Sequence, residues 1–139
     1  MTSIFSRIIA GEIPGHFVWK DDTAVAFLTI EPFREGHVLV VPREEIDHWD
    51  DLPDLTAAHL MIVSRRIARA LKSVFPCKRV GMLIAGLEVP HTHLHIVPID
   101  TLAELSFERA RPAKAEDLAG TAARIREALR SQGNREADF

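Results

Sequence analysis

Three of the seven histidines occupy alternate positions in one short stretch, HTHLHIVP at 91–98. In a β-strand the side chains point to opposite faces in turn, so we expect His91, His93 and His95 to share one face. Imidazole is polar and needs a hydrogen-bonding partner for each ring nitrogen, so core packing does not account for three rings together. The spacing therefore predicts a site that uses the histidine face.

Two chemistries require imidazoles that converge on one small ligand. Neutral imidazoles can bind zinc or another divalent ion, and a hydrolytic metal site usually adds a carboxylate, for which Glu88 is the one close in sequence. Alternatively, one imidazole attacks phosphorus and forms a covalent intermediate while its neighbours hold the phosphate oxygens. The histidine spacing leaves both open. A strand face with incidental histidines is less favoured, because chance seldom produces such regular alternation.

Apolar periodicity predicts an α+β domain with an antiparallel sheet of about five strands, one long helix and short helices towards the termini. We expect, in chain order, a short helix at 4–9, a hairpin of strands at 16–20 and 24–30, a strand at 38–42, a long helix at 54–75, strands at 80–87 and 91–98, and a helix at about 114–131. The run VLVVP at 38–42 is continuously apolar, which predicts a strand buried on both faces. The final stretch, SQGNREADF, is expected to fray.

Composition favours a single globular domain that spans residues 1–139, because 47% of the residues are hydrophobic and 27% are charged. The formal net charge of -3, without blocks of like charge, argues against a nucleic-acid or membrane partner. Cys77 is the single cysteine, and Arg7 and Glu12 interrupt the apolar N-terminal segment, which is not typical of a signal peptide. We therefore expect a cytoplasmic protein.

The histidine stretch resembles the signature of the histidine triad (HIT) superfamily, His-φ-His-φ-His-φ-φ, where φ is an apolar residue. His91 to Val97 match it except that Thr92 occupies the first φ position. Three further stretches are similar to the Hint branch of that superfamily, in the same order. They are IFSRIIAGEIP at 4–14, GHVLVVPR at 36–43 and HLMIV at 59–63. The resemblance covers residues 4–98, implies a HIT-like fold, and leaves the C-terminal helix unmatched.

The resemblance implies a catalytic role for four histidines. His93 matches the nucleophile, which would attack the α-phosphorus of a nucleoside phosphoramidate or a related nucleotide and become transiently nucleotidylated. Water would then release a nucleoside monophosphate. His91 and His95 match the flanking histidines that bind phosphate oxygens, and His37 matches a supporting histidine. The family implies a homodimer and no cofactor, and the mechanism needs no metal.

The same resemblance implies a purine-nucleotide site. Phe5, Ile8, Phe27 and Ile30 are expected to line the pocket for the base, although core packing would use the same residue types. Thr29 stands where the family usually holds the ribose with an aspartate, and it offers one hydroxyl instead. Leu87 and Glu88, just before the triad, complete the expected substrate-binding set.

Two departures from the family pattern change these expectations. Ser6 and Glu45 stand where some HIT proteins have ligands of a structural zinc, so no such zinc is expected. Glu88 replaces a serine that contacts the phosphate and the leaving group. A carboxylate there would repel phosphate unless it were protonated or faced a cation. The resulting hypothesis is a site for an amine leaving group, in which Glu88→Ser would favour anionic or neutral leaving groups over cationic ones.

The sequence as a whole predicts a HIT-type nucleotide hydrolase or transferase of the phosphoramidase kind. Two alternatives remain at this point. One is a nucleotide-binding HIT protein with little catalysis, and the other is a divalent-metal hydrolase that uses the in-line histidines.

Overall fold

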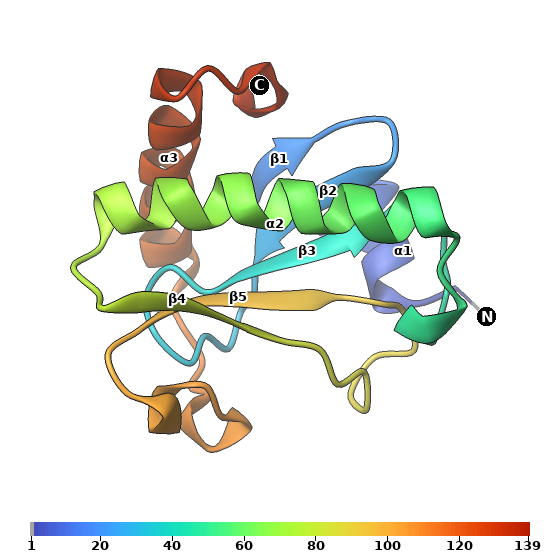
Figure 1. The fold of residues 1–139 in the computed structure, drawn as a ribbon, viewed down its shortest axis with the longest axis horizontal. Coiled ribbons are helices and arrows are strands. Elements are labelled where there is room, and N and C mark those ends of the chain that lie inside the picture. The colour runs from blue at the N-terminus through green and yellow to red at the C-terminus, as the bar shows by residue number, and fades with distance from the viewer. Residues whose placement is uncertain (1) are drawn as a thin grey trace.

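The computed structural model describes residues 2–139 as an antiparallel five-stranded sheet with helices packed against it (Figure 1). The strands are β1 (Phe17–Lys20), β2 (Ala24–Leu28), β3 (Val38–Pro42), β4 (Arg79–Leu83) and β5 (Leu94–Ile99), and the helices are α1 (Ile4–Ile9), α2 (Asp54–Val74) and α3 (Ala115–Ser131). Four short 3₁₀ turns are η1 (Trp49–Asp51), η2 (Leu102–Glu104), η3 (Phe107–Arg109) and η4 (Arg135–Ala137). The strand order is β1-β2-β3-β5-β4. The predicted α+β class is confirmed. None of the helices in residues 2–139 is both long and apolar enough to cross a membrane.

The central strands β2, β3 and β5 are buried on both faces of the sheet. On one face, α2 packs against β3 and β5 while α3 packs against β1 and α2, and together they enclose the larger apolar core (Figure 1). On the other face, Phe5 of α1 covers a smaller core made by Val25, Phe27, Leu39 and Val41. Every residue of β3 is buried, which confirms the strand predicted from the continuous apolar run. The central strands can therefore position groups on the α1 side rigidly.

The long helix α2 forms because its apolar residues recur at helical spacing. Leu60, Val63, Ile67 and Leu71 are buried against the sheet, whereas the arginines between them face outwards. The helix ends at Val74, just before Pro76, since proline cannot donate a helical hydrogen bond. These bounds confirm the predicted helix to within one residue.

The turn between β1 and β2 is built around the carboxylate of Asp21. Its Oδ1 accepts hydrogen bonds from the backbone N–H groups of Thr23 and Ala24, each at 2.7 Å. Its Oδ2 accepts from Trp19 Nε1 and His59 Nε2, also at 2.7 Å. Burial raises the pKa of Asp21, but these hydrogen bonds outweigh that effect and leave the pKa below its usual value. One carboxylate thus fixes the hairpin and ties it to α2.

Two segments differ from the predicted elements near the histidines. Strand β4 ends at Leu83 rather than at residue 87, and β5 begins at Leu94, so His91 and His93 precede the strand. That part of the chain is held instead by Thr92, whose N–H donates to the Ile46 carbonyl at 2.7 Å. The Thr92 hydroxyl donates to the same carbonyl, also at 2.7 Å, so this segment is tied to the stretch after β3 without a strand ladder.

The C-terminal residues are ordered, so the expectation that they fray is wrong. Asn134 is buried, donates from Nδ2 to the Leu129 carbonyl at 3.1 Å, and accepts at Oδ1 from Arg66 at 3.0 Å. Ala137 in η4 is fully buried as well. The polar composition of this stretch gave no sign of these contacts, which join the end of α3 to α2.

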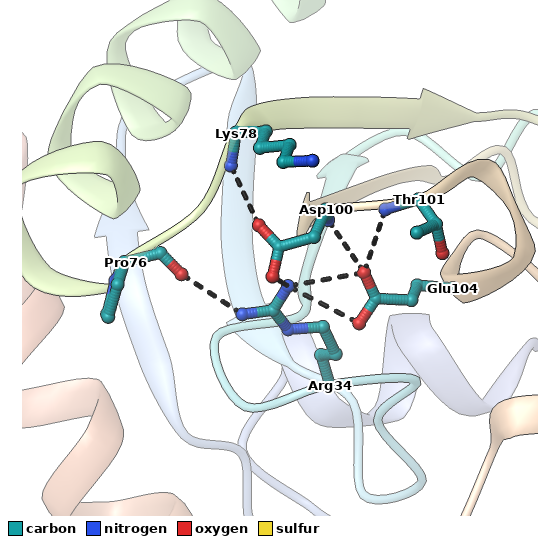
Figure 2. Close-up of polar contacts among 6 residues, drawn as sticks. All are labelled: Arg34, Pro76, Lys78, Asp100, Thr101 and Glu104. Carbon is teal, nitrogen blue, oxygen red and sulfur yellow. Dashed lines mark hydrogen bonds and ion pairs between the residues drawn. The ribbon is translucent and has the colours of Figure 1, made fainter.

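The loop between β2 and β3 is fixed by Arg34. Its side chain points to the segment just before β4 and to the segment just after β5 (Figure 2). Its guanidinium lies 3.3 Å from Asp100 and 3.4 Å from Glu104, and donates to the Pro76 carbonyl at 3.1 Å. Glu104 in turn accepts from the backbone of Thr101 at 3.0 Å. The loop is therefore attached to η2 and to the end of β5.

Gly36 allows the same loop to turn into β3. Its φ of +95° lies in the left-handed region, and a Cβ added there would lie 2.8 Å from Phe75 Cε2 and 3.2 Å from Pro98 Cγ. Both the backbone conformation and the close contact require glycine. The position matters for the site because His37 is the next residue.

We expect Gly36→Ala to lower the free energy of unfolding by about 1–3 kcal/mol, because alanine there is strained and overpacked. The matched control is Gly120→Ala in α3, where a Cβ meets nothing within 4 Å and helix propensity should raise stability by about 1 kcal/mol. Urea denaturation of both variants measures the difference. Equal stability of the two variants would contradict this account of Gly36.

Candidate active site

A largely apolar cavity of about 510 Å³ opens on the α1 side of the sheet. Its walls come from α1, the loop after α1, the ends of β2 and β3, the segment before β5, and η3. Such a volume is in the range of small-molecule sites. The predicted site residues that line it are Phe5, Ile8, Phe27, Thr29, Ile30, His37, Glu88, His93 and His95.

Leu87 does not join these residues. Its side chain is 96% exposed and lines a separate surface hollow with Trp49 and Ile84. The structure does not bring Leu87 to this cavity, and its contact with substrate stays a prediction. The loop turns at Gly86, which has a φ of +84°, and only from Glu88 onwards does it face the histidines.

The His91 ring lies beneath the cavity rather than in its wall. Its Nε2–H donates to the Pro42 carbonyl at 2.8 Å, and its Nδ1 accepts from the Ser3 hydroxyl at 2.7 Å. Burial lowers the pKa of His91, and the ring is fully buried. Both nitrogens thus have protein partners and the ring does not line the cavity, so a contact between His91 and phosphate oxygens stays a prediction. Its part in the site is its backbone carbonyl.

A small hydrogen-bonded cluster supports His91 from the N-terminal side. Ser3 donates its backbone N–H to Glu45 Oε1 at 2.6 Å, and the Ser6 hydroxyl donates to the same oxygen at 2.7 Å. These two hydrogen bonds hold the pKa of Glu45 below its usual value. Serine hydroxyls and one carboxylate that already satisfy each other do not fit a structural zinc site, which uses thiolate and imidazole ligands.

A relay of hydrogen bonds fixes the proton positions on His37 and His95. The backbone N–H of Phe33 donates to His37 Nδ1 at 3.0 Å, so His37 carries its proton on Nε2. That proton is donated to His95 Nδ1 at 2.9 Å, so His95 carries its own proton on Nε2, which faces the cavity. Burial, reinforced by the neighbouring histidines, lowers the pKa of His37 to about 3 and that of His95 to about 4. His95 is therefore a neutral donor at neutral pH.

His93 presents its other nitrogen to the cavity. Its Nδ1–H donates to the His91 carbonyl at 2.7 Å, which leaves Nε2 directed towards the cavity. There Nε2 contacts Oε1 of Glu88, and the same oxygen lies 3.3 Å from His95 Nε2. Burial raises the pKa of Glu88, but hydrogen bonds from the two histidines outweigh this and lower it overall. The carboxylate thus bridges the two imidazoles at the cavity.

Aromatic rings hold the imidazoles in place, and sequence reasoning missed two of them. The His95 ring stacks on Phe33 with centroids 5.7 Å apart and meets the edge of Phe107 at 5.2 Å. Phe5 packs edge-on against His93 at 4.9 Å. Phe33 and Phe107 carry no spacing signal, because they lie in a loop and in the short turn η3, outside the helices and long strands whose periodicity the sequence reveals.

The donor atoms of Glu88, His93 and His95 lie within 4.8 Å of one another, which raises the question of a metal site. A metal ligand must offer a lone pair, but the relay from Phe33 places a proton on His95 Nε2. Moving that proton to Nδ1 would set it against the Nε2–H of His37. These residues therefore fit hydrogen bonding to an anion better than three-ligand metal binding.

Comparison with known proteins places this geometry in a family. The family model of the HIT domain matches residues 10–102 of the sequence, and the chain belongs to the HIT domain family. The "Protein hit" of Bacillus subtilis is 33% identical over 137 residues, covering 92% of this chain and 94% of that protein. An adenosine 5′-monophosphoramidase of Saccharomyces cerevisiae is 34% identical over 96 residues, covering 68% of this chain and 61% of its own length.

Solved structures show the same fold. A zinc-bound histidine triad family protein from Mycobacterium smegmatis superposes with a TM-score of 0.82 at 29% identity, covering 95% of this chain and 96% of that chain. A hypothetical histidine triad nucleotide-binding protein from Sulfolobus tokodaii gives a TM-score of 0.83 at 25% identity, covering 98% and 97%. The predicted HIT-like fold is confirmed.

The buried neutral histidines predict a loss of stability in mild acid. An unfolded histidine binds a proton near pH 6.5, whereas His37 and His95 resist protonation until about pH 3 and 4. Between these values the unfolded chain binds more protons than the folded chain. The free energy of unfolding should therefore fall by about 1.4 kcal/mol for each unit by which the pH is lowered, for each such histidine. Urea denaturation at several values from about pH 7 to about pH 5 measures the slope.

His37→Gln should flatten that slope by about one proton, because glutamine can accept from Phe33 and donate to His95 but does not titrate. The control is His48→Gln, since the His48 side chain is 71% exposed. A slope in His37→Gln that equals that of the unchanged protein would refute the assignment.

Proposed function

We propose that this protein hydrolyses nucleoside 5′-phosphoramidates or closely related nucleotides through a covalent nucleotidyl intermediate on His93. The observation that carries the proposal is the orientation of His93, whose Nδ1 is tied to the His91 carbonyl while Nε2 faces an apolar cavity. A nucleophilic imidazole needs this arrangement, with one nitrogen held and the other directed at the reacting atom. The yeast relatives named as adenosine 5′-monophosphoramidases support the choice of substrate.

The first chemical step would form a bond from His93 Nε2 to the α-phosphorus. The ring becomes cationic as this bond forms, and the hydrogen bond from Nδ1 to the His91 carbonyl then strengthens. His95 would donate its Nε2–H to a phosphate oxygen, and His37 would hold that proton in place through the relay from Phe33. Water would then release the nucleoside monophosphate. These steps require no metal.

The apolar part of the cavity suits a base. Phe5, Ile8 and Phe27 form its inner wall, and Ile30 lies exposed at the rim. Thr29 is beside Ile30, and its hydroxyl accepts from the Glu31 N–H at 3.2 Å, so the hydroxyl proton is available to a ribose oxygen. We propose a purine nucleotide as the occupant.

Single-turnover reaction with labelled adenosine 5′-phosphoramidate tests the nucleophile. We expect the chelator-treated protein to gain the mass of one adenylyl group, and we expect no adduct on His93→Ala, because alanine has no nucleophilic nitrogen. The exposed-site variant His48→Gln serves as the control and should react normally. Binding without an adduct or turnover would favour the alternative of a nucleotide-binding protein with little catalysis.

We also propose a homodimer joined near β4. That strand lies at the edge of the sheet, so one side of its backbone has no strand partner in residues 2–139. Trp49 and Leu87 are exposed and line one hollow beyond the end of β4, which adds apolar surface to the edge. A second copy could cover both features.

Sedimentation velocity at micromolar concentration should give twice the 15.6 kDa mass of one chain. Leu87→Asp should shift the protein towards monomer, because a charge would be buried in the contact. Leu102→Asp is the matched control, since Leu102 is also exposed but lies in η2. A monomeric parent protein would exclude this assembly.

The remaining expectations belong to the same proposal. The formal net charge of -3 gives no support for a nucleic-acid partner. Cys77 is free, which is compatible with a reducing cytoplasm. We therefore propose a cytoplasmic enzyme whose partners are small nucleotides and a second copy of itself.

A further inference from the structure

The carboxylate of Glu88 lies directly in front of the nitrogen that would attack substrate. Its Oε1 contacts His93 Nε2 and lies 3.3 Å from His95 Nε2. The Glu88 side chain is 37% exposed, whereas the His93 side chain is 1% exposed. Glu88 is thus the one of these groups that can swing towards solvent without disturbing the core.

The contact between His93 and Glu88 has two protonation states, which follow from the protons that the neighbouring groups hold. His93 Nδ1 uses its proton on the His91 carbonyl, and His95 Nε2 carries the proton fixed by the relay from Phe33. The contact between His93 Nε2 and Glu88 therefore needs one further proton, which lies either on the ring or on the carboxyl group. With the proton on the ring, Nε2 has no lone pair. With the proton on Glu88, the nucleophile is free and an acid stands beside it.

We propose that Glu88 is the general acid that protonates an amine leaving group, and that it thereby selects phosphoramidates with basic amines as substrates. This inference rests on the proposed function and names the group that completes it. The competent state is the one in which Glu88 holds the shared proton. The Glu88 carboxyl group is partly exposed and contacts His93 Nε2 directly, so the shared proton can pass between carboxyl and imidazole within one hydrogen bond.

Each step balances. His93 Nε2 forms a bond to the α-phosphorus, the phosphorus–nitrogen bond breaks, and the departing nitrogen takes the proton from Glu88, which becomes a carboxylate. In the second step the carboxylate accepts a proton from water as the water oxygen bonds to phosphorus. The bond to His93 then breaks, the monophosphate leaves, and Glu88 again holds one proton.

The charge of Glu88 explains why an amine fits better than a phosphate. An amine leaves poorly unless it is protonated, so a neighbouring acid accelerates its departure. A polyphosphate leaving group needs no such proton, and its negative charge would be repelled once Glu88 is ionised. The described residues that line the cavity include no lysine or arginine to offset this repulsion.

Two derivatives of adenosine monophosphate test whether Glu88 acts on the leaving group or on another part of the reaction. One is an N-alkyl phosphoramidate, whose amine must be protonated, and the other is the p-nitrophenyl ester, whose phenolate leaves unaided. We expect Glu88→Gln to slow phosphorus–nitrogen cleavage by about 100-fold or more and the first cleavage of the ester by less than about 10-fold. The amide is nearly isosteric and can still accept from His95.

A second readout is the fate of the intermediate. Glu88→Gln should release a burst of p-nitrophenol and accumulate the adenylylated protein by intact mass, because no base remains to activate water. Glu88→Ser, a smaller variant without an acid, should show the same preference for the ester over the amine substrate. Thermal unfolding checks that both variants are folded.

The outcomes distinguish this inference from the proposed function. Equal losses on both substrates, or no loss on either, would overturn the role of Glu88 while adduct formation on the parent protein still supported His93 as nucleophile. A parent protein that forms no adduct with either compound would overturn the proposed function and this inference with it.

Discussion

The chemistry of the cavity depends on a single backbone donor, the N–H of Phe33. Because this group can only donate, it fixes the proton of His37 on Nε2, and His37 in turn fixes the proton of His95 towards the cavity. The donor is itself positioned by the turn at Gly36 and by the ion pairs of Arg34, which attach the loop to the end of β5 (Figure 2). The loop between β2 and β3 thus determines which ring nitrogens of the site donate protons and which accept them.

A second chain of contacts orients His93. The His91 ring is locked between Ser3 and the Pro42 carbonyl, so its own carbonyl is held where His93 Nδ1 can donate to it. The three histidines therefore act in different ways although they are spaced alike in sequence. The His91 ring is a buried support, His93 presents Nε2 to the cavity, and His95 directs an Nε2–H into it. Their local spacing made them recognisable, and their distinct partners separate their roles.

The elements that could be predicted are those whose signals are local. The continuous apolar run of β3 and the helical spacing of α2 gave bounds within one residue, because burial pattern and period are properties of the segment itself. The contacts that could not be predicted join distant parts of the chain. Phe33 and Phe107 meet His95 only after the loops close, and Ser3 meets His91 across most of the chain. The buried Asn134 shows the same limit, since a polar stretch was ordered by α2 rather than by its own composition.

The hairpin turn built on Asp21 has a practical consequence for optical work. The chain has two tryptophans and no tyrosine, so its intrinsic emission comes from Trp19 and Trp49 alone. Trp19 is buried and hydrogen-bonded to Asp21, whereas Trp49 is exposed at η1. The indoles thus sit in opposite surroundings: one responds to loss of the folded interior, and the other to whatever covers the outer surface. In the single chain a quencher dissolved in the buffer would reach Trp49 first, so the two signals can be separated without any added dye.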